Sequence, residues 1–319
     1  MELAAIRRVG VVGAGTMGAG IAELFAEAGY AVLWYNRSAA GLQRGLARVR
    51  SNQQALLHHK ILTPTDAEAA LARLAPTAEL EALAPAELIS ESVAEDLAVK
   101  REVWGTLERY CPPEAILTTN TSGLPIAAIA AALAHPARFA GMHFANPPHL
   151  MPLVEIIKGH GTADATCELL LALAHRLHKQ PVFVRKDVPG FIANRLHLAL
   201  LREVLHLIDA GIASPADIDT AVKNGLGLRW AFTGPVEFMD LAGLDLSRAI
   251  CGYLFPVLSD TKAPSQVLLD LVAAGKLGAK SGAGFYEYPG DRAQRIIDDR
   301  DDNLLKLLQL KAQVEKGAL

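Results

Sequence analysis

The sequence predicts an α/β chain in which a doubly wound parallel sheet is followed by an all-helical domain. Three observations carry this prediction: a glycine-rich turn between a strand and a helix, further strand-like runs separated by helical stretches, and a strand-free second part. We place a dinucleotide-binding domain at residues 1–186 and a helical domain at 187–319. The chain has 319 residues, of which 51% are hydrophobic, and this length allows each domain its own core.

The first strand-helix-strand unit covers residues 9–35. Residues 9–12 form a β-branched run, residues 18–27 form a helical stretch ended by Gly29, and residues 31–35 form a second apolar run. This order is typical of a unit that builds a parallel sheet. Further strands are expected at 88–92, 115–119, 139–144, 153–157 and 181–185.

The second part begins with a helix that is apolar on nearly every face, FIANRLHLALLREVLHLIDAG at 191–211. Such a helix should be buried, either within its own domain or against another copy of it. We therefore expect a homodimer formed through the helical domain. Residues 291–319 form a charged amphipathic pattern that favours a solvated surface helix over a partner-binding segment.

The glycine turn points to a dinucleotide. The motif GxGxxG follows a strand and opens a helix, so the first glycine permits the turn, the second lets the backbone approach a pyrophosphate, and the third lets helix and strand pack closely. The phosphates would bind the N–H groups at the N-terminus of that helix. This pattern predicts a Rossmann-type domain whose cofactor turn consists of Gly13, Gly15, Thr16, Met17 and Gly18.

The end of the second strand bears on the cofactor. NAD sites usually carry a carboxylate there, whereas this chain has Asn36, followed by Arg37 and Ser38. Asparagine removes the charge that would repel a 2′-phosphate, and the arginine offers that phosphate a donor fork. The cofactor is thus predicted to be NAD(P)(H), with NADP(H) favoured by these three residues. In the alternative, Arg37 stacks on the adenine of NAD.

Composition argues against several other classes of function. A net charge of −3 with interleaved signs provides no basic field for nucleic acid, which favours a small-molecule substrate. Cys111, Cys167 and Cys251 lie far apart without metal-ligand spacing, so no metal is expected and a reducing cytoplasm fits. We expect neither a membrane span nor a signal peptide.

Five motifs make the chain recognisable: ESVAEDLAVK, TNTSG, GMHFANPPHLMPLVEII, DVPGFIANR and KLGAKSGAGFYEYP. Their order and spacing resemble the L-3-hydroxyacyl-CoA dehydrogenase family from about residue 9 to residue 288. The resemblance implies a reversible hydride transfer between a 3-hydroxyacyl thioester and its 3-oxoacyl form. It also implies a catalytic His143 paired with Glu155, substrate contacts from Ser122 and Asn194, and cofactor contacts from Glu95, Lys100, Asn146 and Lys280.

The chemistry of these residues fits such a reaction. Oxidation of a secondary alcohol requires a base for the hydroxyl proton, and an imidazole such as His143 exchanges protons near neutral pH. A carboxylate such as Glu155 can accept the other ring N–H and stabilise the cation. Ser122 and Asn194 can donate hydrogen bonds to the substrate oxygen.

Two departures keep other substrates open. The segment NGLGLRWAFTGPVEFMDLAG is more similar to lambda-crystallin type L-gulonate dehydrogenases and carnitine dehydrogenases, and its Arg229 could clamp a free carboxylate or form a structural salt bridge. Where the acyl-CoA enzymes place a serine and a lysine toward the CoA tail, this chain has Asn52 and His59, with Lys60 next. The alternatives are therefore a dehydrogenase of a free 3-hydroxy acid and a catalytically silent crystallin-like protein.

Overall fold

The computed structural model of the chain describes residues 1–315 and divides into two compact units. The first unit combines residues 1–195 with the chain from residue 300 onward, and the second unit holds residues 196–299. The sequence-based domain limits, 1–186 and 187–319, stay a prediction.

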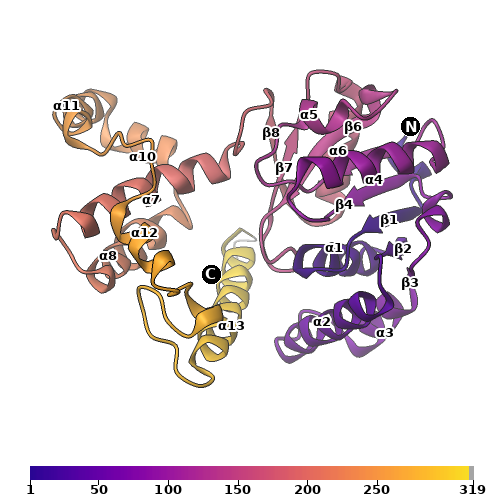
Figure 1. Ribbon diagram of the computed structural model, residues 1–319, viewed down its shortest axis with the longest axis horizontal. Helices are drawn as coiled ribbons and strands as arrows, with labels where there is room; N and C mark the ends of the chain where they lie inside the picture. The colour runs from indigo at the N-terminus through magenta and orange to yellow at the C-terminus, as the bar shows by residue number, and fades with distance from the viewer. Residues whose placement is uncertain (316–319) are drawn as a thin grey trace. The chain divides into compact units, whose positions relative to one another are not determined.

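The first unit contains an eight-stranded sheet with the order β3-β2-β1-β4-β5-β6-β7-β8 (Figure 1). The strands predicted from the sequence are found within one residue of their expected limits. An additional edge strand, β3, had no sequence signal, because it is four residues long and contains Pro76. The strands are β1 (Arg8–Val12), β2 (Ala31–Tyr35), β3 (Leu74–Thr77), β4 (Leu88–Glu91), β5 (Ile116–Thr119), β6 (Phe139–Phe144), β7 (Leu153–Ile157) and β8 (Gln180–Val184).

Two strands, β7 and β8, run opposite to the other six. β7 pairs antiparallel with β6, while β1 to β6 pair in parallel and β8 is again parallel to β7. The connection between β6 and β7 is residues 145–152, which is too short for the crossover helix that a parallel pair needs. The antiparallel register places His143 directly opposite Glu155.

Helices cover both faces of this sheet (Figure 1). Apolar residues of α1, α2 and α6 form one core with one face, and those of α4 and α5 form a second core with the other. This two-sided burial explains why the central strands β4 and β5 are buried at every position and begin with apolar residues. The helices are α1 (Thr16–Glu27), α2 (Ala39–His58), α3 (Pro64–Ala72), α4 (Leu97–Tyr110), α5 (Ile126–Ala130) and α6 (Asp164–Arg176).

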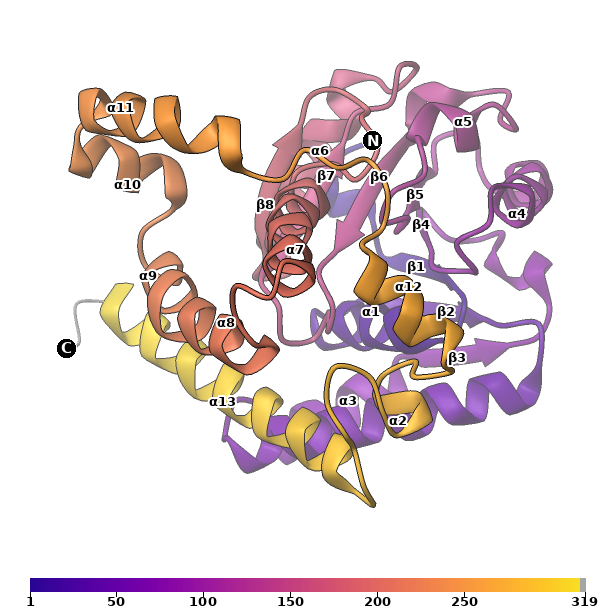
Figure 2. The ribbon, with the colours of Figure 1, turned by 60° about the vertical axis from the view of Figure 1, so that its left-hand side comes forward.

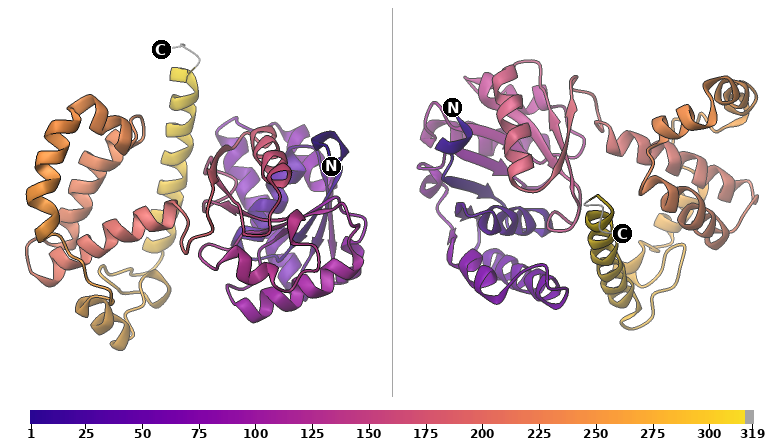
Figure 3. Two further views of the ribbon diagram at one scale, coloured as in Figure 1. Left: turned by 90° about the horizontal axis from the view of Figure 1, so that it is seen from above. Right: turned by 180° about the vertical axis from the view of Figure 1, so that it is seen from behind.

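The second unit consists of helices joined by loops (Figure 3). It exposes many large apolar side chains, and α7, expected to be buried, has no buried residue. In the described part of this chain α7 is therefore not buried within its own domain. The helices are α7 (Ala193–Asp209), which starts in the first unit, α8 (Pro215–Ala221), a π-helical stretch (Val222–Gly227), α9 (Leu228–Trp230), α10 (Pro235–Ala242), α11 (Leu244–Leu254) and α12 (Gln266–Ala273).

The final helix, α13 (Arg292–Glu315), is one continuous element (Figure 2). The predicted amphipathic helix is thus present, although residues 316–319 lie outside the described chain. One face is not solvated as expected: Leu305 is buried in a small cluster with Leu56 of α2 and Leu150. Asp302 also forms an ion pair with His59 at the end of α2, at 2.7 Å.

Candidate active site

The glycine turn is a close-packed corner between β1 and α1. Gly13 has a φ of 107°, and a Cβ there would lie 2.5 Å from the carbonyl oxygen of Ser92. A Cβ on Gly18 would lie 2.1 Å from the Gly13 carbonyl oxygen, whereas a Cβ on Gly15 would meet nothing within 4 Å. Two glycines therefore serve packing, and the third leaves open space beside the N-terminus of α1, which suits a pyrophosphate.

A tryptophan that the sequence analysis did not single out supports this corner. Trp34 of β2 is fully buried, and its indole N–H donates to the Gly13 carbonyl at 2.9 Å. A Cβ on Gly45 of α2 would lie 2.7 Å from the same ring, so α2 also packs closely against it. The signal available in the sequence was only an aromatic residue within a buried strand.

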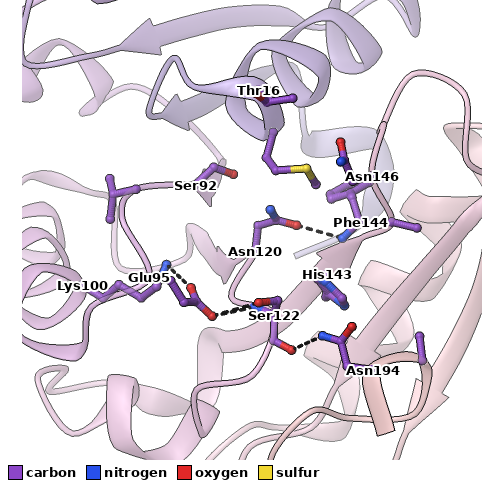
Figure 4. Close-up of a pocket in the computed structure, with 14 residues that line it drawn as sticks. Thr16, Ser92, Glu95, Lys100, Asn120, Ser122, His143, Phe144, Asn146 and Asn194 are labelled. Carbon is purple, nitrogen blue, oxygen red and sulfur yellow. Dashed lines mark hydrogen bonds and ion pairs between the residues drawn. The ribbon is translucent and has the colours of Figure 1, made fainter. Parts of the chain in front are cut away.

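A cavity of about 580 Å³ opens at the carboxyl edge of the sheet beside this turn (Figure 4). This edge is where open α/β sheets bind ligands, and the volume lies within the usual range for small-molecule sites. The lining residues are Thr16, Met17, Ser92, Val93, Glu95, Lys100, Asn120, Ser122, His143, Phe144, Ala145, Asn146, Ala193 and Asn194.

His143 and Glu155 form a close pair beside the cavity. The Nδ1 atom of His143 is 2.7 Å from Oε2 of Glu155, as the antiparallel register predicts for facing residues. Glu155 is buried, while His143 lines the cavity. We assign the ring proton to Nδ1, because a carboxylate accepts hydrogen bonds, and this leaves Nε2 as the nitrogen able to accept a proton.

Glu155 also anchors the start of α7. Its Oε1 accepts the backbone N–H groups of Ile192 at 2.8 Å and Ala193 at 3.0 Å. Burial disfavours the charged carboxylate, but the hydrogen bond from His143 and the two backbone donors outweigh it and lower the pKa of Glu155. The carboxylate is therefore ionised at neutral pH and can stabilise an imidazolium.

The two expected substrate donors, Ser122 and Asn194, lie near His143 and contact each other (Figure 4). The Asn194 amide donates to the backbone carbonyl of Ser122 at 2.7 Å, which fixes the turn that carries the serine. The Ser122 hydroxyl donates to Glu95 at 3.3 Å, and Glu95 also accepts from Thr121 Oγ1 at 2.6 Å. The amide nitrogen of Asn194 therefore binds the Ser122 carbonyl, and its amide oxygen takes no part in this hydrogen bond.

Lys100 is buried beneath the same wall. Only 1% of its side chain is exposed, and its Nζ lies 2.6 Å from Glu91 and 3.3 Å from Glu95. Burial disfavours the charged form of Glu95. The hydrogen bond from Thr121 and the attraction of Lys100 outweigh this effect and lower the pKa of Glu95. Lys100 therefore orients Glu95. Glu91, which also accepts from Thr119 at 2.7 Å, was missed by the sequence analysis, although it ends a strand at the ligand-binding edge.

Asn120 was also missed. It follows β5, lines the cavity, and its Oδ1 accepts the backbone N–H of Phe144 at 2.8 Å. This bond ties the end of β5 to the end of β6, next to His143 (Figure 4). The sequence signal was its place in TNTSG, immediately after a strand.

The three residues after β2 form the N-cap of α2. The Ser38 hydroxyl oxygen accepts from Gly41 N at 3.2 Å, and the Asn36 amide donates to the Ser38 carbonyl at 3.0 Å. Asn36 therefore keeps its amide oxygen as a remaining acceptor, and Arg37 is exposed.

Two predicted ligand-binding residues belong to the second unit. Lys280 lies in a short 3₁₀ helix (Ala279–Ser281) and is exposed. Arg229 of α9 stacks on the ring of Phe238, with its guanidinium carbon 4.5 Å from the ring centroid. Their roles toward cofactor and substrate stay predictions, as do those of the other site residues.

The α2 positions considered for CoA contact are engaged elsewhere. Asn52 donates to the buried Glu23 of α1 at 2.6 Å. The His59 ring pairs with Asp302 of α13, and its backbone carbonyl accepts from Gln309 of the same helix at 2.9 Å. In the described part of the chain, α13 thus occupies this face at the C-terminal end of α2.

Two further observations concern other kinds of site. Within residues 1–315, no helix is both long and apolar enough to cross a membrane. The same residues contain no cluster of three or more histidine, cysteine or acidic side chains that could hold a metal ion.

The fold and the site define the class of protein as an NAD-dependent dehydrogenase with a Rossmann-type domain. Residues 8–188 match the family described as 3-hydroxyacyl-CoA dehydrogenase, NAD binding domain. Residues 190–288 match 3-hydroxyacyl-CoA dehydrogenase, C-terminal domain. The chain belongs to the 3-hydroxyacyl-CoA dehydrogenase family, which confirms the resemblance drawn from the five motifs.

Relatives within this family differ in how much of the chain they match. The 5-formyl-3-hydroxy-2-methylpyridine 4-carboxylate 5-dehydrogenase of Mesorhizobium japonicum is 33% identical over 96% of this chain and 98% of its own length. A crystal structure of the enzyme of that name, described as an NAD⁺-dependent dismutase, superposes with a TM-score of 0.90 over the same shares.

Other relatives include enzymes named for CoA thioesters, and one of them, the 3-hydroxyacyl-CoA dehydrogenase of Archaeoglobus fulgidus, covers 95% of this chain at 32% identity. A probable 3-hydroxybutyryl-CoA dehydrogenase of Bacillus subtilis is 38% identical over 89% of this chain and 98% of its own length. The crystal structure of Mycobacterium tuberculosis FadB2 is 38% identical, covers 89% of this chain and 99% of its own, and has a TM-score of 0.76.

Proposed function

We propose that the chain interconverts a 3-hydroxy substrate and its 3-oxo form through a His143–Glu155 dyad. The observation that carries this proposal is the 2.7 Å contact between the two side chains at the wall of the cavity that begins at the glycine turn. A nicotinamide cofactor held at the glycine turn and the N-terminus of α1 would supply the hydride acceptor for oxidation and the hydride donor for reduction.

The side chains of the site transfer the proton, stabilise the charged imidazole and contact the substrate. Nε2 of His143 takes the hydroxyl proton as the hydride leaves, and returns that proton to the carbonyl oxygen in the reverse reaction. The ionised Glu155 holds the ring by Nδ1 and stabilises the imidazolium. The turn at Ser122, fixed by Asn194, holds its hydroxyl at the cavity wall, where the O–H turns from Glu95 to donate to the substrate oxygen.

A 3-hydroxyacyl-CoA thioester is the first candidate substrate. It is supported by the family to which both parts of the chain belong and by relatives at 38% identity that are named for 3-hydroxybutyryl-CoA. A free 3-hydroxy acid is the second candidate, with Arg229 as the proposed carboxylate clamp.

Two observations favour the second candidate. The crystal structure named for a free pyridine carboxylate superposes with a TM-score of 0.90, whereas structures named for 3-hydroxybutyryl-CoA and 3-hydroxyacyl-CoA dehydrogenases give 0.75 and 0.68. In addition, α13 occupies the face of α2 where the resemblance places CoA contacts, through the His59–Asp302 ion pair.

A substrate panel tests the proposal. The reduction assays would use acetoacetyl-CoA, the acetoacetyl thioester of N-acetylcysteamine and free acetoacetate, each with NADH and with NADPH. The oxidation assay would use L-gulonate with NAD⁺ and with NADP⁺. Turnover of acetoacetyl-CoA supports the first candidate. Turnover of the free acids, lost in Arg229→Ala, supports the second. Silence on a broad panel despite measured NADH binding would contradict both and favour the crystallin-like alternative.

We also propose that the nucleotide site accepts a 2′-phosphate. Asn36 carries no charge to repel the phosphate, and the exposed Arg37 can donate to it. The ratio of kcat/KM for NADPH to that for NADH should fall about tenfold in Arg37→Ala and in Asn36→Asp. A strong wild-type preference for NADH would contradict the proposal.

We propose a homodimer formed through the helical domain. The apolar surface of the second unit supports this, because monomeric proteins rarely expose extended patches of this kind. The exposed side chains include Leu198, Phe232, Leu241, Leu244, Tyr253 and Phe255.

A further inference from the structure

A buried lysine outside the reacting centre holds the loop between β6 and β7, residues 145–152. Lys179 follows α6 and is 5% exposed. Its Nζ donates to the backbone carbonyls of Pro148 at 2.6 Å and Met151 at 3.0 Å. Buried carbonyls need donors, so this one ammonium satisfies two positions of the loop.

The other side of the loop rests on the cofactor helix. A Cβ built on Gly20 of α1 would lie 3.1 Å from Cδ of Pro148, so the proline ring packs directly on the helix backbone. The first residues of α1, Thr16 and Met17, line the cavity. The loop is therefore fixed between the helix expected to hold the pyrophosphate and a buried cation.

Two acidic side chains of α1 attract that cation, although burial raises the pKa of one of them, Glu23, well above its usual value. Burial lowers the pKa of Lys179 to about 8, and the attraction of Glu27 and Glu23 opposes the shift. Burial also raises the pKa of Glu27 to about 7. On the far side, burial lowers the pKa of His149 to about 4, against the attraction of Asp301.

The loop carries Asn146 into the cavity. Asn146 and Ala145 line the cavity directly after β6, the strand of His143, and the side chain of Asn146 is exposed there (Figure 4). Pro148, two residues further on, is the first point at which the loop is anchored by Lys179. The direction of the Asn146 side chain thus depends on a backbone that Lys179 fixes.

We propose that Lys179 is a positioning residue, which presents Asn146 to the cofactor by anchoring the β6–β7 loop. This role goes beyond the proposed reaction, because it concerns cofactor affinity and can be measured without any substrate.

The test is a double-mutant cycle on NADH binding. Lys179→Met should raise the dissociation constant of NADH about tenfold in the wild-type background, measured by fluorescence titration. In an Asn146→Ala background, the same change should have less than about a threefold effect, because the group that Lys179 positions is already absent. Faster amide hydrogen exchange confined to residues 145–152 should accompany the loss.

The matched control is Lys158→Met. Lys158 lies in the same unit, but it pairs with the exposed Asp164 and does not contact the loop. Its removal should leave NADH affinity unchanged. Equal effects of Lys179→Met in both backgrounds would show a general structural role and overturn the proposal.

A second variant keeps the proposal testable if Lys179→Met does not fold. Gly20→Ala presses a methyl group on Pro148 and disturbs the same loop from the other side. It should weaken NADH binding in the wild type and have little effect in the Asn146→Ala background. Additive losses in this cycle would equally contradict the role of the loop.

Discussion

The two units of the chain differ in how much of their apolar surface they bury. In the first unit, two cores on either side of the sheet bury the central strands, and even charged groups such as Lys100 and Glu91 are paired below the surface. In the second unit, helices such as α10 and α11 have no buried residue, and α11 displays a side chain as large as Tyr253.

This difference separates chemistry from assembly. Every residue that lines the cavity belongs to the first unit, where buried hydrogen bonds preorganise the polar groups. The second unit lacks a complete core within the described chain, which is expected of a domain that is completed by a partner. Changes in the first unit should therefore alter turnover or cofactor binding. Changes on the exposed apolar surface of the second unit, away from Arg229 and Lys280, should alter the oligomeric state.

The largest expected effect is on His143. His143→Gln removes the proton acceptor, so kcat should fall about 10²–10⁴-fold. NADH affinity should change little, because the hydrogen bonds of the glycine turn remain. Steady-state kinetics with the preferred substrate, together with an NADH titration, check both parts. A variant that retained most of its turnover would remove the base assignment.

The next effect concerns the second unit. Leu241→Glu places a charge on a side chain that is 75% exposed in the single chain. If a second copy covers this surface, the dimer dissociation constant should rise at least tenfold in sedimentation velocity. Ile61→Glu is the matched control, because Ile61 is an exposed apolar residue of the first unit. A wild-type chain that is monomeric at all accessible concentrations would contradict the proposed dimer.

The last effect is on stability and concerns the buried acid of α1. The folded chain holds the Glu27 proton up to a pKa of about 7, against 4.5 for the ordinary side chain. The wild-type free energy of unfolding therefore loses a contribution as pH rises from about 4.5 to about 7. Glu27→Gln should lack this loss. Relative to the difference at pH 4, it should gain about 3 kcal/mol of stability over wild type at pH 8.

Urea denaturation of both proteins at the two pH values measures this difference. The lowered pKa of His149 increases the free energy of unfolding as pH rises from about 4 to 6.5, which is opposite to the effect of Glu27. Both proteins contain His149, so its contribution cancels in the difference between them. A difference that did not change with pH would show that the Glu27 carboxyl is ionised in the folded chain like an ordinary one.

The sheet was predictable because its signals are local. Strand-like runs bounded by turns predicted β4 to β8, and GxGxxG after a strand predicted the cofactor corner. The edge strand β3 was not predictable, because Leu74–Thr77 acquires its extended form only by pairing with β2.

The partners within the site were less accessible to sequence analysis. The motifs indicated His143 and Glu155, yet their contact depends on the antiparallel turn of the chain after β6, which no residue pattern indicated. Glu91, Asn120 and Trp34 act through hydrogen bonds to residues distant in sequence. Such pairings are set by tertiary structure, so composition and spacing carry little information about them.

The central claim is that His143 and Glu155 act as one catalytic unit, and a double-mutant cycle on kcat tests it most directly. If Glu155 acts only through the imidazole, adding Glu155→Gln to His143→Gln should cost almost nothing further. Multiplicative losses in the double variant, or a Glu155→Gln variant with wild-type turnover, would contradict the account.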